Sequence, residues 1–165
     1  MYYAIPKRIE KMCIIDSPGI TYDLGELKVL CKENNVDDIS DIFVVKEPAG
    51  VQKLMNLAFY KDKKIPKKIL NQTYELYFSK HHKQLTALLS SLPAEQDKMK
   101  NANINKYPKS LVIWGIEDDV FPLKEGEKLA THMGAEFFEI SKAGHAPNVE
   151  QFKAFYTKFK SFLDN

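Results

Sequence analysis

The sequence predicts an α/β protein in which parallel strands alternate with helices and a long helical stretch interrupts the alternation. Three short apolar runs bounded by turn residues are typical of buried strands. Helical patterns accompany the third run, and the stretch between the first two runs has helical periodicity without a strand pattern. A length of 165 residues and an apolar fraction of 44% fit a folded chain with a real core.

The three apolar runs are expected to form one sheet. The runs at residues 11–16 and 110–115 are continuously apolar, which is typical of strands covered on both faces. The run at residues 136–141 is aromatic and β-branched. Turn residues follow each run, so each strand is expected to end at a loop.

Two helices are expected around the third strand. Pro122 and Gly134 flank an apolar pattern at residues 123–134, and they are good start and stop signals for a helix. Residues 150–163 carry aromatic side chains three and four positions apart, which predicts a helix with one apolar face. The order strand, helix, strand, helix implies parallel strands joined by right-handed crossovers.

The middle of the chain is expected to be an all-helical insertion. It has amphipathic pieces that Pro48, Pro66 and Pro93 are expected to separate, and Lys-rich runs, such as residues 98–105, that are expected to be solvated loops. The sequence therefore divides into three parts. These are a core strand segment at 1–20, a helical cap at 21–105 and a C-terminal core at 106–165.

Charge balance and cysteine count exclude several classes of protein. The formal net charge is +2 and Arg8 is the only arginine, so neither nucleic acid nor a membrane surface is expected as a partner. Cys13 and Cys31 are too few for a disulfide scaffold, which favours free thiols and a cytoplasmic location. No apolar run reaches the ~20 residues of a membrane span, and residues 1–11 lack the apolar region of a signal peptide.

The loops after the second and third predicted strands hold the candidate catalytic residues. Asp118 lies in the loop at 115–122 and His145 in the loop at 142–148. The carboxyl ends of parallel strands meet at one edge of a sheet, so the two side chains are expected to lie close together. A carboxylate that accepts a hydrogen bond from one imidazole nitrogen leaves the other nitrogen to act as a base.

Both residues also have a structural interpretation. Asp118 and Asp119 could cap the helix that follows Pro122, and a single loop histidine is often a surface residue. Gly144 and Pro147 favour the catalytic interpretation. Glycine permits a left-handed backbone or a close approach, and proline stiffens the loop.

No metal site and no cofactor is expected. The acidic residues at 117–119 have no matching ligands at a recognisable spacing. His81, His82 and His132 lack the spacing of a metal site as well.

The two loops resemble those of the α/β-hydrolase family. Residues 111–115, followed by Asp118 and then Phe121-Pro122, are similar to the family's acid-bearing strand and loop, and residues 143–150 are similar to its histidine loop. Residues 5–16 resemble the strand that follows the nucleophile helix. Residues 57–61 and the Pro66 segment resemble a branch that contains carbon–carbon bond hydrolases and plant esterase-like proteins.

The resemblance implies an incomplete α/β-hydrolase fold. It would contain three parallel strands from the family's sixth strand onward, flanking helices, and an inserted all-helical cap. The resemblance makes Asp118 the triad acid and His145 the general base, and it leaves Glu117 and Asp119 as structural or solvated residues.

No serine of the chain stands in the family's nucleophile motif, Gly-x-Ser-x-Gly. Ser17 comes nearest, but Pro18 has no N–H to donate to an oxyanion. We therefore expect a truncated chain that carries the acid and the base without the nucleophile.

Three functional hypotheses follow. The first is a partial hydrolase, inactive alone, whose complete parent cleaves an ester or a C–C bond of a small apolar substrate. Core packing of short helices is the favoured interpretation for most of the candidate pocket residues, which are Phe59, Tyr60, Tyr77 and Phe78. The alternative is a non-catalytic ligand-binding or protein-interaction module, and the third is a degenerate product without a stable fold. An uncovered edge on the first strand favours self-association.

Overall fold

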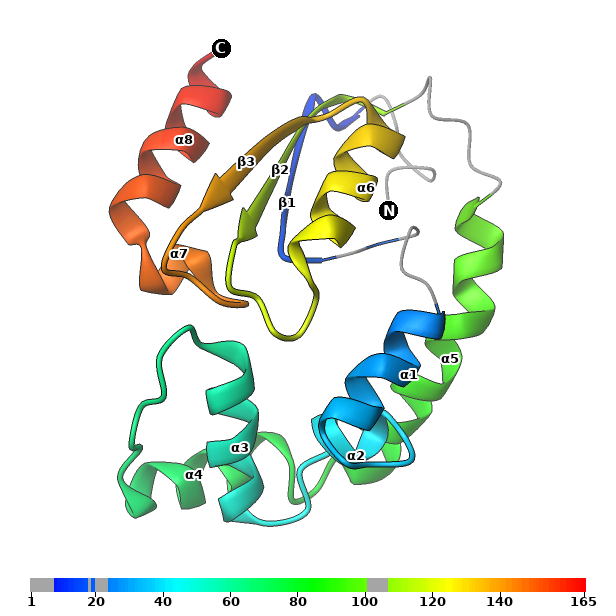
Figure 1. Cartoon of the computed structure of the whole chain (residues 1–165), viewed down its shortest axis with the longest axis vertical. Coiled ribbons are helices and arrows are strands. Elements are labelled where there is room, and N and C mark those ends of the chain that lie inside the picture. The colour runs from blue at the N-terminus through cyan, green and yellow to red at the C-terminus, as the bar shows by residue number, and fades with distance from the viewer. Residues whose placement is uncertain (1–7, 18, 20–23, 101–106) are drawn as a thin grey trace.

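A three-stranded parallel sheet forms the centre of the computed structural model, which describes residues 8–17, 19, 24–100 and 107–165 (Figure 1). The strands are β1 (Lys11–Ile15), β2 (Lys109–Gly115) and β3 (Glu136–Ile140), with β2 in the middle. Both pairings are parallel, which confirms the predicted sheet, and each strand lies within one residue of its predicted bounds.

Three helices follow β2 in the chain: α6 (Leu123–Met133), α7 (Pro147–Glu150) and α8 (Phe152–Asp164). Gly134 ends α6 in the left-handed conformation, with φ of 61°, as its position after the apolar pattern predicts. The predicted helix at 150–163 is wrong at its start, because Gln151 separates α7 from α8. Gln151 has φ of −128° and ψ of 51°, and its side-chain amide donates to the Lys142 carbonyl at 2.9 Å, which holds this residue out of the helix.

The two faces of β2 are both covered, so its side chains alternate between two layers of core. Leu111 and Ile113 pack with aromatic side chains of α8, whereas Val112 and Trp114 pack with apolar side chains of α6. All four side chains are fully buried. This two-sided burial is why the run is apolar without a period of two.

Helices fill the chain between β1 and β2, and we call residues 24–100 the helical segment. Its helices are α1 (Leu24–Glu33), α2 (Ser40–Phe43), α3 (Pro48–Ala58), α4 (Lys67–Tyr77) and α5 (His82–Lys100). The strands point their carboxyl ends toward this segment (Figure 1). The carboxyl end of α3 meets the loop that follows β3, where the His145 N–H donates to the Ala58 carbonyl.

The three prolines of the helical segment play different parts. Pro48 is the first residue of α3 and Pro66 stands immediately before α4, so both mark helix starts as expected. The prediction that Pro93 separates two helices is wrong, because α5 runs through it to Lys100. Strong helix formers on both sides, such as Leu, Ala, Glu, Gln and Lys, favour continuation across the single backbone hydrogen bond that proline removes.

Parts of three predicted features lie outside the described residues. The first is residues 5–7 of the segment 5–16, which resembles the strand after the family's nucleophile helix. The others are Pro18 of the turn after β1 and residues 101–105 of the Lys-rich run. The described part of that run, residues 98–100, is helical rather than a loop.

Ion pairs join the helical segment to the sheet's helices. Glu26 of α1 accepts from Lys124 at 2.6 Å and from Lys128 at 3.2 Å, and Lys128 also pairs with the fully buried Glu125 at 2.8 Å. These contacts fasten α1 to α6 and so help to hold the helical segment over the sheet edge. Across the described residues, no helix combines the length and the apolar character that crossing a membrane requires.

Candidate active site

The loop after β2 holds the Asp118 carboxylate in a fixed place. Oδ1 of Asp118 accepts from the backbone N–H groups of Val120 at 2.8 Å and Phe121 at 3.0 Å. The indole N–H of Trp114 donates to the Phe121 carbonyl at 2.9 Å and anchors the loop to the core. Asp118 thus caps its own turn, not α6, whose N-cap residue Pro122 has no side-chain cap.

The loop after β3 brings His145 to this carboxylate. Nδ1 of His145 lies 3.0 Å from Oδ2 of Asp118, across 27 residues of chain. A carboxylate oxygen only accepts, so Nδ1–H of the neutral ring is the donor and Nε2 keeps its lone pair. Among the described residues Nε2 has no hydrogen-bond partner, and the side chain is 33% exposed. The structure therefore brings together the two residues that the sequence singled out.

Charge around His145 favours its protonated form. Burial by itself disfavours the imidazolium, but the hydrogen bond to Asp118 and the negative charges of Asp118 and Asp16 outweigh that effect, and the pKa of His145 is raised above its ordinary value. The edge of the Phe121 ring, 5.4 Å between centroids, packs against the imidazole. The ring can therefore take up a proton at Nε2 without losing its position.

Asp16 is a second carboxyl group near this pair that the sequence did not single out. It directly follows β1, has φ of 42° and is 2% exposed. Its Oδ1 accepts from the Gly115 N–H at 2.7 Å, whereas its Oδ2 has no partner among the described residues. Burial is the main cause that raises the pKa of Asp16 from 3.8 to about 7. The signal that could have found it is its place at the carboxyl end of a parallel strand.

The last residue of β2 and the loop after β3 approach closely through their backbones. A Cβ at Gly115 would lie 2.1 Å from the Gly144 carbonyl oxygen, so only glycine fits there. Glu117 adds two links between the same loops, because its N–H donates to the Ala143 carbonyl and its Oε2 accepts from the Ala143 N–H, both at 3.1 Å. Glu117 is therefore a structural residue, as the resemblance implies.

Gly144 is needed for close approach and not for a left-handed backbone. Its φ is not positive, so the left-handed part of the expectation is wrong. A Cβ at Gly144 would lie 2.7 Å from the Ala58 carbonyl oxygen and 2.9 Å from the Tyr60 nitrogen, which leaves no room for a side chain. Close packing against the end of α3 is the reason for glycine here.

The four pocket candidates lie in two places. Phe59 and Tyr60 follow α3 directly and pack by their backbone against the histidine loop. Tyr77 ends α4 and is 65% exposed, and Phe78 follows it. Their role in binding a substrate stays a prediction.

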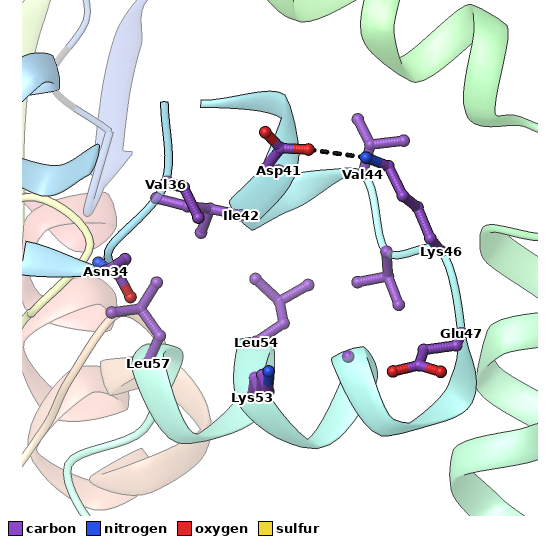
Figure 2. Close-up of a pocket in the computed structure, with 12 residues that line it drawn as sticks. Asn34, Val36, Asp41, Ile42, Val44, Lys46, Glu47, Lys53, Leu54 and Leu57 are labelled. Carbon is purple, nitrogen blue, oxygen red and sulfur yellow. Dashed lines mark hydrogen bonds and ion pairs between the residues drawn. The ribbon is translucent and has the colours of Figure 1, made fainter. Parts of the chain in front are cut away.

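A cavity of about 240 Å³ lies inside the helical segment (Figure 2). Leu54 and Leu57 project from α3 toward Val36 and Ile42 on its opposite wall. An ion pair between Lys46 and Asp41, 2.7 Å long, lies at its rim. None of the four pocket candidates lines this cavity. Its walls are Asn34, Val36, Asp41, Ile42, Val44, Val45, Lys46, Glu47, Gly50, Lys53, Leu54 and Leu57.

Two kinds of group are missing from the described part of the chain. No set of three or more His, Cys, Asp or Glu residues there could hold a metal ion. No serine hydroxyl there bonds to His145, and the hydroxyls of four serines donate to backbone carbonyls nearby. These are Ser79, Ser90, Ser91 and Ser110.

Solved structures resemble the chain, although no protein-family model and no curated protein sequence matches it. A serine hydrolase from the polyaromatic-hydrocarbon-degrading bacterium Cycloclasticus zankles is 17% identical with a TM-score of 0.74, covering 99% of this chain and 58% of that one. The 2-hydroxy-6-oxo-6-phenylhexa-2,4-dienoate hydrolase of Rhodococcus sp. strain RHA1 is 15% identical with a TM-score of 0.70, covering 99% and 58%. A thermophilic esterase is 20% identical with a TM-score of 0.63, covering 99% and 59%.

These matches cover nearly all of this chain. The chain spans 58% to 59% of the length of the three solved chains. In this chain the matched part contains three parallel strands, helices on both faces and a helical segment between β1 and β2. The chain has the α/β-hydrolase fold over the part that these matches cover.

Proposed function

We propose that this chain supplies the acid and the base of a hydrolase active site, and that another polypeptide segment supplies the nucleophile. The observation that carries the proposal is the hydrogen bond from Nδ1–H of His145 to the buried Asp118, which leaves Nε2 without a partner among the described residues. A buried carboxylate behind an imidazole is the arrangement that activates a hydroxyl group.

The chemistry of this pair follows from its geometry. Nε2 of His145 would accept the proton of a hydroxyl as its oxygen attacks the scissile carbonyl carbon. Asp118 would stabilise the imidazolium that forms, and Nε2 would then return the proton to the leaving group. The hydroxyl must come from outside the chain, since no serine here has the Gly-x-Ser-x-Gly frame and four of the serine hydroxyls are bonded to backbone carbonyls. Alone, the chain is therefore expected to be inactive.

The substrate class we propose is a small apolar molecule that contains an ester or a cleavable C–C bond. Similar folds belong to a hydrolase of a phenylhexadienoate and to an esterase, which supports this class. The helical segment acts as the cap, and the backbone of Phe59 and Tyr60 lies against the histidine loop. These two residues, with Tyr77 and Phe78, remain the proposed pocket residues.

The outer edge of β1 is the proposed docking place for the missing segment. Among the described residues β1 pairs on one side alone, with β2. An unpaired edge next to apolar side chains such as Ile14 binds another strand readily. This chain covers 58% of each of two solved chains of the same fold, so we propose a parallel strand of a nucleophile-bearing segment as the occupant. Without it the same edge would drive self-association.

One observation favours the second candidate function, a non-catalytic ligand-binding module. The cavity of about 240 Å³ is lined by residues of the helical segment alone. A ligand could therefore bind there without any hydrolytic chemistry. The compartment we propose for either function is the cytoplasm, because both Cys13 and Cys31 are free thiols.

Two experiments test the proposal. A fluorophosphonate probe should leave the purified chain unlabelled, and labelling at any of its serines would overturn the claim that the nucleophile comes from elsewhere. Joining the chain to the nucleophile-bearing half of a related esterase should restore hydrolysis of a p-nitrophenyl ester. His145→Ala and Asp118→Asn should each abolish most of that hydrolysis, whereas Ser79→Ala should leave it unchanged. Full activity in both triad variants would refute the assignment.

Gene sequence offers a quicker check. Codons for Gly-x-Ser-x-Gly in the genomic DNA ahead of Met1, in the same frame, would show that the nucleophile belongs to the same polypeptide. A second gene with such a motif and no histidine loop would point to a split enzyme.

A further inference from the structure

Glu150, the last residue of α7, uses one carboxylate to join two distant parts of the chain. Its Oε2 accepts from the Gly144 N–H at 2.7 Å, and its Oε1 accepts from the Tyr60 N–H at 3.0 Å. The second bond spans 90 residues of sequence, from the histidine loop to the residue that follows Phe59 after α3. Charge-assisted hydrogen bonds of this kind are among the stronger ones in proteins.

Other contacts place the same two segments against each other. The His145 N–H donates to the Ala58 carbonyl at 2.7 Å. Gly144 packs so tightly on residues 58–60 that a Cβ would lie 2.7 Å from the Ala58 oxygen. The backbone that carries the imidazole is therefore held on one side by the end of α3, and Glu150 closes that contact.

The opposite side of the histidine loop, residues 142–148, packs against the loop at 115–122 that carries Asp118. A Cβ at Gly115 would lie 2.1 Å from the Gly144 carbonyl oxygen, and Glu117 bonds to Ala143. The loop is thus clamped between the end of β2 and the end of α3. A change in the α3 contact would change where the His145 ring meets Asp118.

We propose that Glu150 is a positioning residue, whose carboxylate ties the histidine loop to the end of α3 and so fixes the His145 ring at its hydrogen bond to Asp118. The proposal rests on the proposed function only in that His145 is the base. The geometry itself can be tested in this chain without any activity.

The wild-type chain gives the first test, by nuclear magnetic resonance. If one carboxylate binds both amides, the amide protons of Gly144 and Tyr60 should both exchange slowly with solvent. Fast exchange at either amide would overturn the bridge.

Two substitutions separate position from charge. Glu150→Gln keeps the length of the side chain but points an NH₂ group at one of the two N–H donors. Glu150→Asp keeps the charge but is one methylene too short to reach both amides. Each should speed amide exchange at Gly144 and Tyr60 by about tenfold or more. Each should also lower the pKa of His145, because the ring loses its fixed contact with Asp118.

Glu139→Gln, at an exposed position on β3, is the matched control for the loss of one negative charge and should change neither readout. A fall in the pKa of His145 in Glu150→Gln but not in Glu150→Asp would mean that Glu150 acts by charge, which would overturn the proposal. Failure of the hybrid esterase to hydrolyse ester, with these results intact, would count against the proposed function and not against the bridge.

Discussion

Replacing Asp16 by Asn should make the chain more stable at alkaline pH and change its stability little at acid pH. Asp16 is 2% exposed and only one of its oxygens has a partner among the described residues, the Gly115 N–H. Burial raises its pKa most, the charges of Asp118 and Glu150 raise it further, and the Gly115 hydrogen bond and His145 oppose these effects. The carboxyl group therefore releases its proton in the folded chain only near pH 7.

The size and sign of the effect follow from the difference between the pKa of Asp16 in the unfolded chain and its raised pKa in the folded chain. Below about pH 4 the carboxyl is protonated in the folded and unfolded chains alike. As pH rises from 3.8 to about 7, the unfolded chain gives up this proton and the folded chain keeps it, so the free energy of unfolding falls. The whole loss is at most about 4 kcal/mol and is complete above about pH 7. Asn carries no charge at any pH, and its Oδ1 can still accept from the Gly115 N–H.

Urea unfolding of the wild-type chain and of Asp16→Asn at about pH 4.5 and about pH 8 measures this difference. The stability of the variant relative to the wild type should rise by roughly 3 kcal/mol between the two pH values. Asp62→Asn, at an exposed position between α3 and α4, is the control and should show no such change. A difference between Asp16→Asn and the wild type that stays constant with pH would refute the reasoning.

Three further outcomes are expected. Asp118→Asn should lower the pKa of His145, measured by titration of the ring protons, since the hydrogen bond and charge that raise it are lost, and an unchanged pKa would contradict the pairing. Gly126→Ala should reduce the free energy of unfolding by about 1–3 kcal/mol in thermal melts, because its Cβ would lie 2.5 Å from the ring of the fully buried Trp114; a wild-type melting temperature would show that α6 can move away. Light scattering should find the isolated chain self-associated through the open edge of β1, whereas a monomer with one sharp unfolding transition would argue against that edge being exposed.

The sheet and the acid–base pair could be predicted because their signals are local. Two continuous apolar runs and one aromatic, β-branched run, each ending in turn residues, predicted the three strands. The rule that parallel strands end at one edge placed Asp118 near His145. The start and stop of α6 followed from Pro122 and Gly134. Each of these inferences needs only residues that are neighbours in the chain, together with a general rule of topology.

Contacts that depend on tertiary packing could not be predicted. The spacing of Glu150 from His145 does not predict a contact between Glu150 and Tyr60, because the two are 90 residues apart. They meet only because α3 ends beside the histidine loop. The break at Gln151 depends in the same way on its bond to the Lys142 carbonyl. Pro93 failed as a stop signal because the residues around it favour a helix more than one proline opposes it.

The protonation of the His145 ring tests the central claim most directly. Long-range ¹H–¹⁵N correlation on the isolated chain, above the pKa of the ring, shows which nitrogen of the neutral imidazole carries the proton. The hydrogen bond of 3.0 Å to Asp118 predicts a proton on Nδ1 and an unprotonated Nε2, ready to accept a proton from a hydroxyl. A neutral ring protonated at Nε2 would mean that His145 is not oriented by Asp118, and the hydrolase interpretation of this site would fail.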